Sequence, residues 1–263
     1  MIDGMLAIDA HCHVGEAKRE RHGLRSFGAD ELIARMDQNG IDKAVIQHLV
    51  FPLWEPEDFK QGNNRVVEAA FSYPDRLRGL ALVNPKHGRF AEQEVRRCLE
   101  AGLKGIKLQP VLHAYPIDGE LLDPLMNVAA RANVPVVTHS DFNAKTCTPY
   151  QVARLAARWP QVTIVMLHMG IDLEMMDQVP SILKAVPNVV VETSQTHDHP
   201  YTVYVHTARR LGADRVLFGS DGPALSLEVA LTKLAMAEQR HGLTKEEKAK
   251  ILGLNAARVF GFK

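Results

Sequence analysis

A closed barrel of eight parallel strands, each followed by a helix, is the fold class that three features of the sequence predict. The length of 263 residues matches the usual size of such a barrel. Runs rich in valine, isoleucine and leucine alternate with stretches of helical periodicity, and no linker of different composition interrupts them. An open, doubly wound sheet is the alternative, but the length and the number of runs favour the barrel. We therefore expect residues 1–263 to form a single (β/α)8 barrel domain with a C-terminal helical extension at about residues 244–260.

The predicted strands are short and bounded by Gly, Pro, Asn or Asp, as buried parallel strands usually are. They cover residues 6–11, 43–49, 77–83, 105–109, 134–139, 162–168, 189–193 and 216–219. Each is followed by a stretch long enough for a helix, which gives the repeating strand–helix order of a barrel.

The helices are predicted from apolar periodicity and from signals at their ends. A helix over residues 30–38 stops at Asn39-Gly40, a C-terminal signal. Thr148-Pro149 opens another helix, with an N-cap residue followed by proline at the first helical position. Pro180 is expected to kink or break a helix over residues 173–185. The other predicted helices cover residues 64–73, 90–101, 121–132, 201–211 and 227–241.

Composition argues against several classes of function. Lys plus Arg and Asp plus Glu number 31 each, so the neutral chain offers no electrostatic footprint for nucleic acid or an anionic membrane. No apolar stretch is long enough for a membrane span, and the N-terminus lacks a basic region followed by an apolar one. Three widely spaced cysteines make a disulfide framework improbable. We expect a cytoplasmic protein that acts on a small molecule, without nucleic acid or membrane as partner.

Side chains that bind metals occur at the predicted C-terminal ends of four strands, where barrel enzymes place their active sites. His11 and His13 are two residues apart at the end of the first strand, so they should share a face. His139 and His168 end the fifth and sixth strands, and Asp221 lies at the tip of the eighth. Each alone has an ordinary structural explanation. Together, three imidazoles and a carboxylate would form a zinc-type site with room for water.

Two other residues of the first strand have different expected roles. Asp9 should face the same way as His11 but lie lower in the barrel, where it would support the site without taking part in catalysis. Cys12 should face the helix layer, so we expect it to be neither a nucleophile nor a ligand.

Six motifs follow one another along the chain: Ile8-Asp9-Ala10-His11-Cys12-His13, Gly105-Ile106-Lys107-Leu108-Gln109-Pro110, Thr138-His139, Leu167-His168-Met169-Gly170, Phe218-Gly219-Ser220-Asp221 and Asn255-Ala256-Ala257-Arg258. In this order they resemble the amidohydrolase superfamily. The resemblance is to the branch that includes aminocarboxymuconate semialdehyde decarboxylase and small metal-dependent hydrolases.

The resemblance implies one divalent metal, usually zinc with manganese as the alternative, held by His11, His13, His139 and Asp221. It also implies that His168 lies beside the metal as the acid/base that acts on water. A histidine that titrates near neutrality suits proton transfer, and the second oxygen of Asp221 could hold the water and relay its proton. His168 and Asp221 are therefore the expected catalytic residues.

Lys107 leaves the number of metals open. It ends the fourth strand, where a lysine becomes carboxylated and bridges two ions in the two-metal members of this superfamily. The local motif looks like the related branch, so one metal is favoured over two. Unmodified, Lys107 is a candidate substrate contact, and so are Gln109, Trp54 and His197. The basic loop at residues 16–25 is either a solvated surface or a binding site for an acidic substrate group.

Hydrolysis is the favoured reaction, with a metal-activated water attacking an amide, ester or lactone of a small, carboxylate-bearing substrate. The alternative is non-oxidative decarboxylation of an unsaturated or aromatic carboxylic acid. The related decarboxylases tend to have larger insertions after the first strand than the roughly fifteen residues here, which weighs mildly against decarboxylation. Binding of a metal or ligand without turnover is a third possibility, disfavoured because every expected ligand is present. Members of this branch are often homodimers, so a homodimer is possible.

Overall fold

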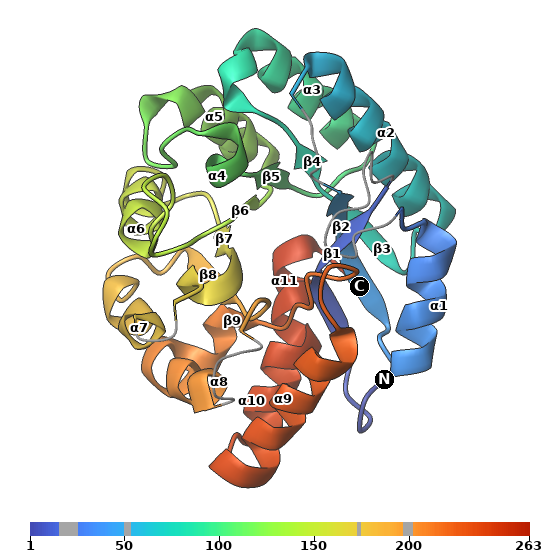
Figure 1. Ribbon diagram of the computed structural model, residues 1–263, viewed down its shortest axis with the longest axis vertical. Helices are drawn as coiled ribbons and strands as arrows, with labels where there is room; N and C mark the ends of the chain where they lie inside the picture. The colour runs from blue at the N-terminus through green and yellow to red at the C-terminus, as the bar shows by residue number, and fades with distance from the viewer. Residues whose placement is uncertain (16–25, 50–53, 173–174, 197–201) are drawn as a thin grey trace.

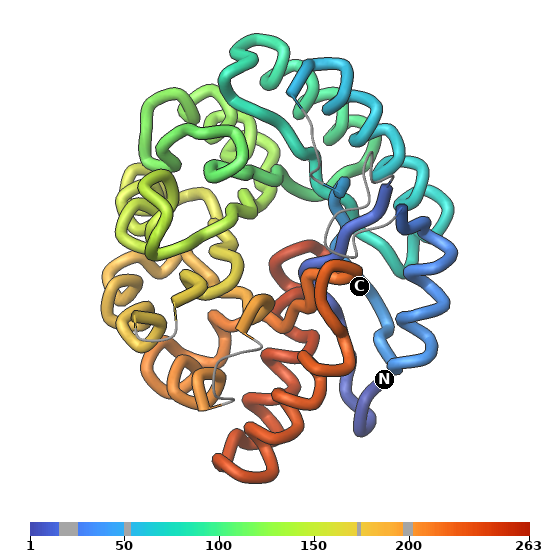
Figure 2. Tube along the Cα trace, viewed as in Figure 1, coloured from blue at the N-terminus to red at the C-terminus, as the bar shows by residue number. Residues whose placement is uncertain are grey.

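The structure, a computed structural model, describes residues 1–15, 26–49, 54–172, 175–196 and 202–263. A ring of parallel strands is surrounded by helices, which confirms the predicted barrel class (Figure 1). The chain passes once around this ring, so the strands formed by its beginning and its end are neighbours (Figure 2).

Every predicted strand is present, one of them as two pieces. The strands are β1 Ile8–Val14, β2 Lys43–His48, β3 Leu77–Gly79, β4 Ala81–Leu82, β5 Ile106–Leu108, β6 Val136–Thr138, β7 Ile164–Met166, β8 Val189–Glu192 and β9 Val216–Leu217. β1 extends further than predicted and carries both of its histidines within the strand.

Backbone hydrogen bonds close the ring at two places. The strands form one sheet with the order β1-β2-β3 and another running from β4 to β9. β3 and β4 are successive parts of one extended segment, and the amide of Leu80 between them donates to Ile46 O at 2.9 Å. On the other side, Ala10 N donates to Phe218 O at 2.9 Å and Asp221 N donates to His11 O at 2.8 Å. The first and last strands are thereby held side by side, with Asp221 next to His11.

The helices are α1 Ala29–Asn39, α2 Pro56–Ser72, α3 Arg89–Glu100, α4 Pro110–His113, α5 Asp123–Ala132, α6 Pro149–Arg158, α7 Val179–Ile182, α8 Thr202–Thr207, α9 Leu227–His241, α10 Lys245–Ala249 and α11 Asn255–Phe260. Gly40 ends α1 in the left-handed conformation, and Thr148 caps α6 with Gln151 as its partner in a capping box. Both end signals in the sequence therefore located a helix end correctly. Among the described helices, none has the length and apolar character needed to cross a membrane.

Two helices differ from their predicted ranges. α2 begins at Pro56 rather than at residue 64, and Gly62 lies inside it. A Cβ atom on Gly62 would lie 2.7 Å from His48 Cγ, so this glycine allows close packing on β2 and tertiary contact overrides its poor helix propensity. The predicted helix over residues 173–185 is broken, as one of the two expected outcomes at Pro180: a 3-10 turn at Met176–Gln178 precedes the short α7, and Pro180 lies in the first turn of α7.

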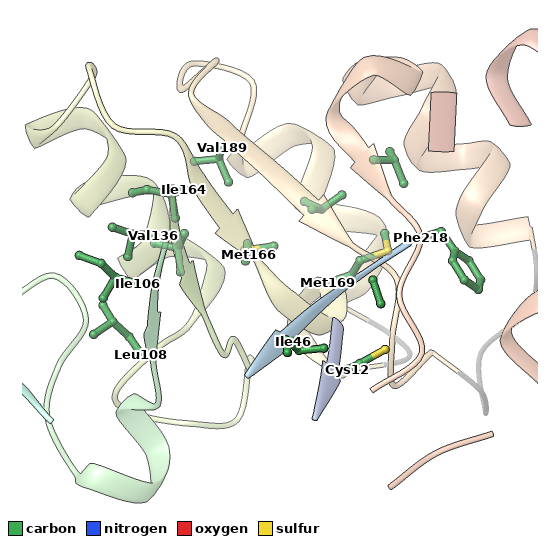
Figure 3. Close-up of a cluster of buried hydrophobic side chains, with 14 of the residues drawn as sticks. Cys12, Ile46, Ile106, Leu108, Val136, Ile164, Met166, Met169, Val189 and Phe218 are labelled. Atoms are coloured by element: carbon green, nitrogen blue, oxygen red, sulfur yellow. The ribbon is translucent and has the colours of Figure 1, made fainter. Parts of the chain in front are cut away.

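Apolar side chains form two layers. The larger layer lies between the strands and the helices, and Cys12 belongs to it, as expected (Figure 3). The smaller layer fills the inside of the ring, where Phe260 of α11 packs with side chains from seven of the strand segments, namely Ala10, Val45, Leu80, Val137, Val165, Val190 and Leu217. A Cβ atom on Gly253 would lie 2.1 Å from Leu6 O, so the segment before α11 runs against the chain just before β1. α11 therefore closes the end of the ring opposite the predicted site.

Candidate metal centre

Three residues that line a cavity at the C-terminal end of the ring have positive φ angles, which are uncommon outside glycine and mark local backbone strain. His168 follows β7 with a φ of 65°, Gln195 follows β8 with a φ of 56°, and Asp221 follows β9 with a φ of 60°. Each turn directs a side chain toward the same cavity. Strain of this kind gathers where the fold must aim functional groups, so the backbone itself indicates a site here.

An irregularity in β1 sets the direction of its side chains. The pairing of β1 with β2 shifts between Asp9 and Cys12. Because Ile8 and Ala10 face the inner core, Asp9 between them faces away from it. The expectation that Asp9 faces the same way as His11 is therefore wrong, since the shift interrupts the alternation on which it rested. Asp9 does support the site, because its carboxylate accepts hydrogen bonds from the amide and hydroxyl of Ser220 at 2.9 and 2.5 Å.

His11, His13 and Asp221 bring three electron-pair donors together. Asp221 Oδ1 lies 3.3 Å from His11 Nε2 and 2.9 Å from His13 Nε2. His13 Nδ1 lies 3.2 Å from His48 O, which can only accept, so the proton of a neutral His13 is on Nδ1 and its Nε2 carries a lone pair. His11 Nε2 is buried and has no hydrogen-bond partner within the described part of the chain.

These three residues fit a divalent cation. Burial lowers the pKa of His11 well below its usual value, so this imidazole is neutral near pH 7. The pKa of Asp221 lies well below its usual value even though burial raises it, so this carboxyl group is ionised near pH 7. Neutral imidazoles facing a carboxylate oxygen in a buried site are the ligand set of zinc and similar transition metals.

A second group adjoins the first and shares His11 with it. Glu192 Oε2 lies 3.4 Å from His11 Nδ1 and accepts a 3.4 Å hydrogen bond from the amide of His168. Ser194 Oγ lies 2.8 Å from His168 Nδ1 and 3.1 Å from His11 Nδ1. Burial raises the pKa of Glu192 to about 7 and lowers that of His168 well below its usual value. Ser194 thus contacts both imidazoles at Nδ1, and Glu192 contacts His11 Nδ1 and the backbone amide of His168.

Glu192, Ser194 and Gln195 belong to the polar run at residues 192–199, which the sequence indicates as able to contribute side chains to the mouth of the barrel, but none of the three was predicted individually as a site residue. Glu192 lies two residues after Val190, which faces the inner core, so alternation along β8 could have identified it. Ser194 and Gln195 lie beyond the strand, where no periodicity applies. Gln195 Nε2 donates to Asp221 Oδ2 at 2.8 Å and holds the second carboxylate oxygen.

His139 lies beside this cluster. Its ring centroid is 4.7 Å from that of His168, and both residues line the same cavity. Burial, and then the positive charge of Lys107, lower the pKa of His139 to about 3. Ligand atoms that lie within 4.8 Å of one another are found in the groups His11–His13–Asp221 and His11–His168–Glu192, and His139 is in neither. Its role as a metal ligand remains a prediction.

The cavity over the cluster has a volume of about 220 Å³ and a lining of both polar and apolar residues. The polar ones are His11, His13, Gln109, His139, His168, Gln195 and Asp221, and the apolar ones are Leu49, Val111, Leu112 and Ala224. Gln109 is therefore placed where a substrate contact was expected. Trp54 is 59% exposed and is not part of this lining. His197 and the basic loop at residues 16–25 lie outside the described residues.

Lys107 lies inside the ring below the cavity. Its register partner in β6 is Val137 of the inner core, and its side chain is completely buried. Nζ has no hydrogen-bond partner among the residues described, and burial lowers the pKa of Lys107 to about 7. Lys107 is not among the lining residues, so both substrate contact and carboxylation remain predictions.

Comparison with known proteins gives the family. The sequence model of the amidohydrolases matches residues 8–262, so the chain belongs to the amidohydrolase family and is an enzyme. No match was found among curated proteins.

Solved structures with the same fold include decarboxylases and a hydrolase. A 2,6-dihydroxybenzoate decarboxylase from Rhizobium has a TM-score of 0.79 and 18% identity, covering 99% of each chain. A 5-carboxyvanillate decarboxylase from Novosphingobium aromaticivorans, solved with manganese and 4-hydroxy-3-methoxy-5-nitrobenzoic acid, has a TM-score of 0.79 and 17% identity over 98% of this chain and 96% of that one. A probable 2-pyrone-4,6-dicarboxylic acid hydrolase from Acinetobacter baumannii has a TM-score of 0.75 and 18% identity over 98% of this chain and 100% of that one. At these identities the likeness shows the fold.

Proposed function

We propose that this enzyme is a metal-dependent hydrolase of a small amide, ester or lactone, with zinc as the metal and manganese as the alternative. The observation that carries the proposal is the position of Asp221 Oδ1, within 3.3 Å of two imidazole nitrogens at the floor of a cavity. His11, His13 and Asp221 would hold the ion, with His139 as the fourth ligand. When bound, a divalent ion would polarise a carbonyl group and lower the pKa of water toward neutrality.

His168 is the residue best placed to move a proton. Its Nδ1 is engaged by Ser194 Oγ, so Nε2 is the nitrogen left for substrate or water. Because burial keeps this imidazole neutral near pH 7, it can accept a proton from water and then return it to the leaving group. Glu192 lies behind Ser194 and stabilises the positive charge that His168 acquires. Gln195 holds Asp221 in one orientation during this exchange.

The cavity limits the substrate to a small molecule with both polar and apolar groups. Its volume of about 220 Å³ is small for a ligand site. Among the residues described, no arginine or lysine lines it, so the expected carboxylate group of the substrate has no cationic side chain there. Recognition of such a group by the loop at residues 16–25 or by His197 remains part of the proposal.

Decarboxylation of an unsaturated or aromatic acid is the second candidate. It is favoured by the reactions named for two of the structural neighbours, which share the fold over almost their whole length. The same cavity could serve it, because His168, once it has taken a proton from water or from a substrate hydroxyl group, could deliver that proton to a substrate carbon before carbon dioxide leaves.

One screen separates the two reactions. Protein prepared without metal and then loaded with zinc or manganese is tested on lactones and esters by proton release and on amides by the amine that is freed. A second panel of aromatic and unsaturated acids is tested by release of carbon dioxide. We expect turnover in the first panel, and a loss of at least about a hundredfold in His168→Asn and Asp221→Asn. Turnover confined to the second panel would replace hydrolysis by decarboxylation. Equal activity of both variants and wild type would refute the assigned site.

A further inference from the structure

We propose that the hydroxyl group of Ser194 fixes the tautomer of two histidines at once, so that His11 and His168 both present Nε2 as a lone pair. Ser194 is thus a positioning residue of the candidate metal centre. The inference deepens the proposed function and rests on the same site.

The hydroxyl group of Ser194 contacts several polar atoms at once. Ser194 is 2% exposed, and its Oγ lies 2.7 Å from Glu192 Oε2. The same oxygen lies 2.8 Å from His168 Nδ1 and 3.1 Å from His11 Nδ1. Three polar atoms therefore share a hydroxyl group that has one proton and two lone pairs.

Ser194 is the donor in its hydrogen bond with Glu192. Oε1 accepts a 2.5 Å hydrogen bond from the amide of Ser194, and Oε2 accepts a 3.4 Å bond from the amide of His168. Backbone amides can only donate, so both oxygens of Glu192 accept hydrogen bonds from the backbone. Ser194 Oγ–H is the donor in the 2.7 Å hydrogen bond to Oε2.

The direction of this hydrogen bond determines which nitrogen of each imidazole carries the proton. With its proton committed to Glu192, Ser194 Oγ can only accept from His11 and His168. Each ring must then carry its proton on Nδ1, and a neutral imidazole has only one N–H. Nε2 of His11 is therefore a lone pair facing Asp221 Oδ1, ready to bind a cation, and Nε2 of His168 is a lone pair available to accept a proton.

The fold holds this arrangement rigidly. A Cβ atom on Gly219 would lie 2.1 Å from Glu192 Oε1, so the carboxylate packs directly against the backbone after β9. Glu192 ends β8 and Ser194 is two residues further, which places a carboxylate and a hydroxyl from one segment behind histidines from two other segments.

The test compares Ser194→Ala with Ser194→Thr, which retains the hydroxyl group. Thr193→Val is the matched control, because it removes a neighbouring buried hydroxyl group whose hydrogen bonds are to Gly219 N and Tyr204 and not to an imidazole. Zinc affinity of the metal-free proteins is measured by competition with a chromophoric chelator. The tautomers are read from imidazole nitrogen shifts in ¹⁵N-histidine-labelled protein, with His168→Gln used for assignment.

We expect Ser194→Ala to weaken zinc binding by roughly 10- to 100-fold, the usual effect of removing a group that orients a metal ligand. The Nδ1–H signatures of His11 and His168 should become mixtures in this variant and return in Ser194→Thr. Unchanged zinc affinity and tautomers in Ser194→Ala, or an Nε2–H form of His168 in wild type, would overturn the inference. Failure of wild type to bind zinc or manganese would instead refute the proposed function.

Discussion

The burial of Lys107 is costly, because its amino group lies inside the ring without a hydrogen-bond partner in the part of the chain described. Burial is the main cause of its low pKa, and Asp221 and Glu192 compensate only in part. A residue kept at such a cost beneath a reactive cluster is a candidate for function. The consequence for stability can be tested separately from any function.

We predict that Lys107→Met stabilises the metal-free protein in a pH-dependent way. The pKa of Lys107 is about 7 in the folded state against 10.5 for the free side chain, so between these values only the unfolded chain holds the proton. Wild-type stability should therefore rise with pH across this window, while the variant lacks this contribution.

The gain in the free energy of unfolding should be a few kcal/mol at pH 6 to 7, since each pKa unit is worth about 1.4 kcal/mol, and should shrink toward pH 10. Urea unfolding at several pH values with a chelator present measures it. Lys104→Met, at an exposed position, is the control. If Lys107→Met raised the free energy of unfolding by the same amount at every pH, the lowered pKa of the buried Lys107 would be contradicted.

Gly219→Ala is predicted to disturb the site through sterics alone. The new Cβ atom would lie 2.1 Å from Glu192 Oε1, so the carboxylate or the strand end must move. We expect a loss of about 1 to 3 kcal/mol in stability together with weaker zinc binding. Gly28→Ala, where a Cβ atom meets nothing within 4 Å, should leave zinc binding unchanged. Thermal unfolding and chelator competition on both variants measure these effects, and intact zinc binding in Gly219→Ala would show that Glu192 does not support the ligands.

At the scale of elements, the sequence allows the strands to be located but not the irregularities within them. Uniformly apolar runs define buried parallel strands, and end signals such as Thr148-Pro149 depend only on neighbouring residues. The register shift in β1 depends on pairing with β2, so the direction of Asp9 could not be read from alternation. The early start of α2 has a local signal that the prediction overlooked, a capping box between Glu55 and Asp58 with Pro56 at the first helical position.

The closing helix α11 gives a prediction for an element far from the chemistry. Phe260 is 2% exposed in the inner core, so Phe260→Ala should cost about 3 to 5 kcal/mol of unfolding free energy. Leu254→Ala, at a position 50% exposed, should cost much less. Zinc affinity should stay the same in both, because the site lies at the opposite end of the ring. A fall in zinc affinity in Phe260→Ala, in protein that is still folded, would mean that the two ends of the barrel are coupled.

At the scale of the whole molecule, the barrel explains which parts of the site the sequence could predict. The C-terminal ends of the strands converge in a barrel, so the sequence alone predicts that His11, His13, His168 and Asp221 lie close together. Ser194 and Gln195 reach the site through turns after β8, and a left-handed residue at Gln195 is not encoded by any periodicity. The supporting contacts therefore required the structure.

The same convergence makes metal binding a property of the folded state only, and this gives a prediction for global stability. His11 and Asp221 come from opposite ends of the chain, so unfolding separates the ligands. Zinc at about 100 times its dissociation constant should then stabilise the protein by roughly 2.7 kcal/mol, or about 5 to 10 °C in Tm. The gain should fall as pH decreases, because the imidazoles bind metal only when deprotonated.

Asp221→Asn separates a metal ligand from an ordinary structural residue. The amide has nearly the same shape, and its N–H group can donate to the imidazole lone pairs that a carboxylate oxygen faces in the metal-free protein. We expect the metal-free variant to be at least as stable as wild type while losing most of the zinc-dependent rise in Tm. Calorimetry with and without zinc measures both quantities. A variant that is destabilised without metal but retains the full zinc-dependent rise would show that Asp221 holds the fold together and does not bind the ion.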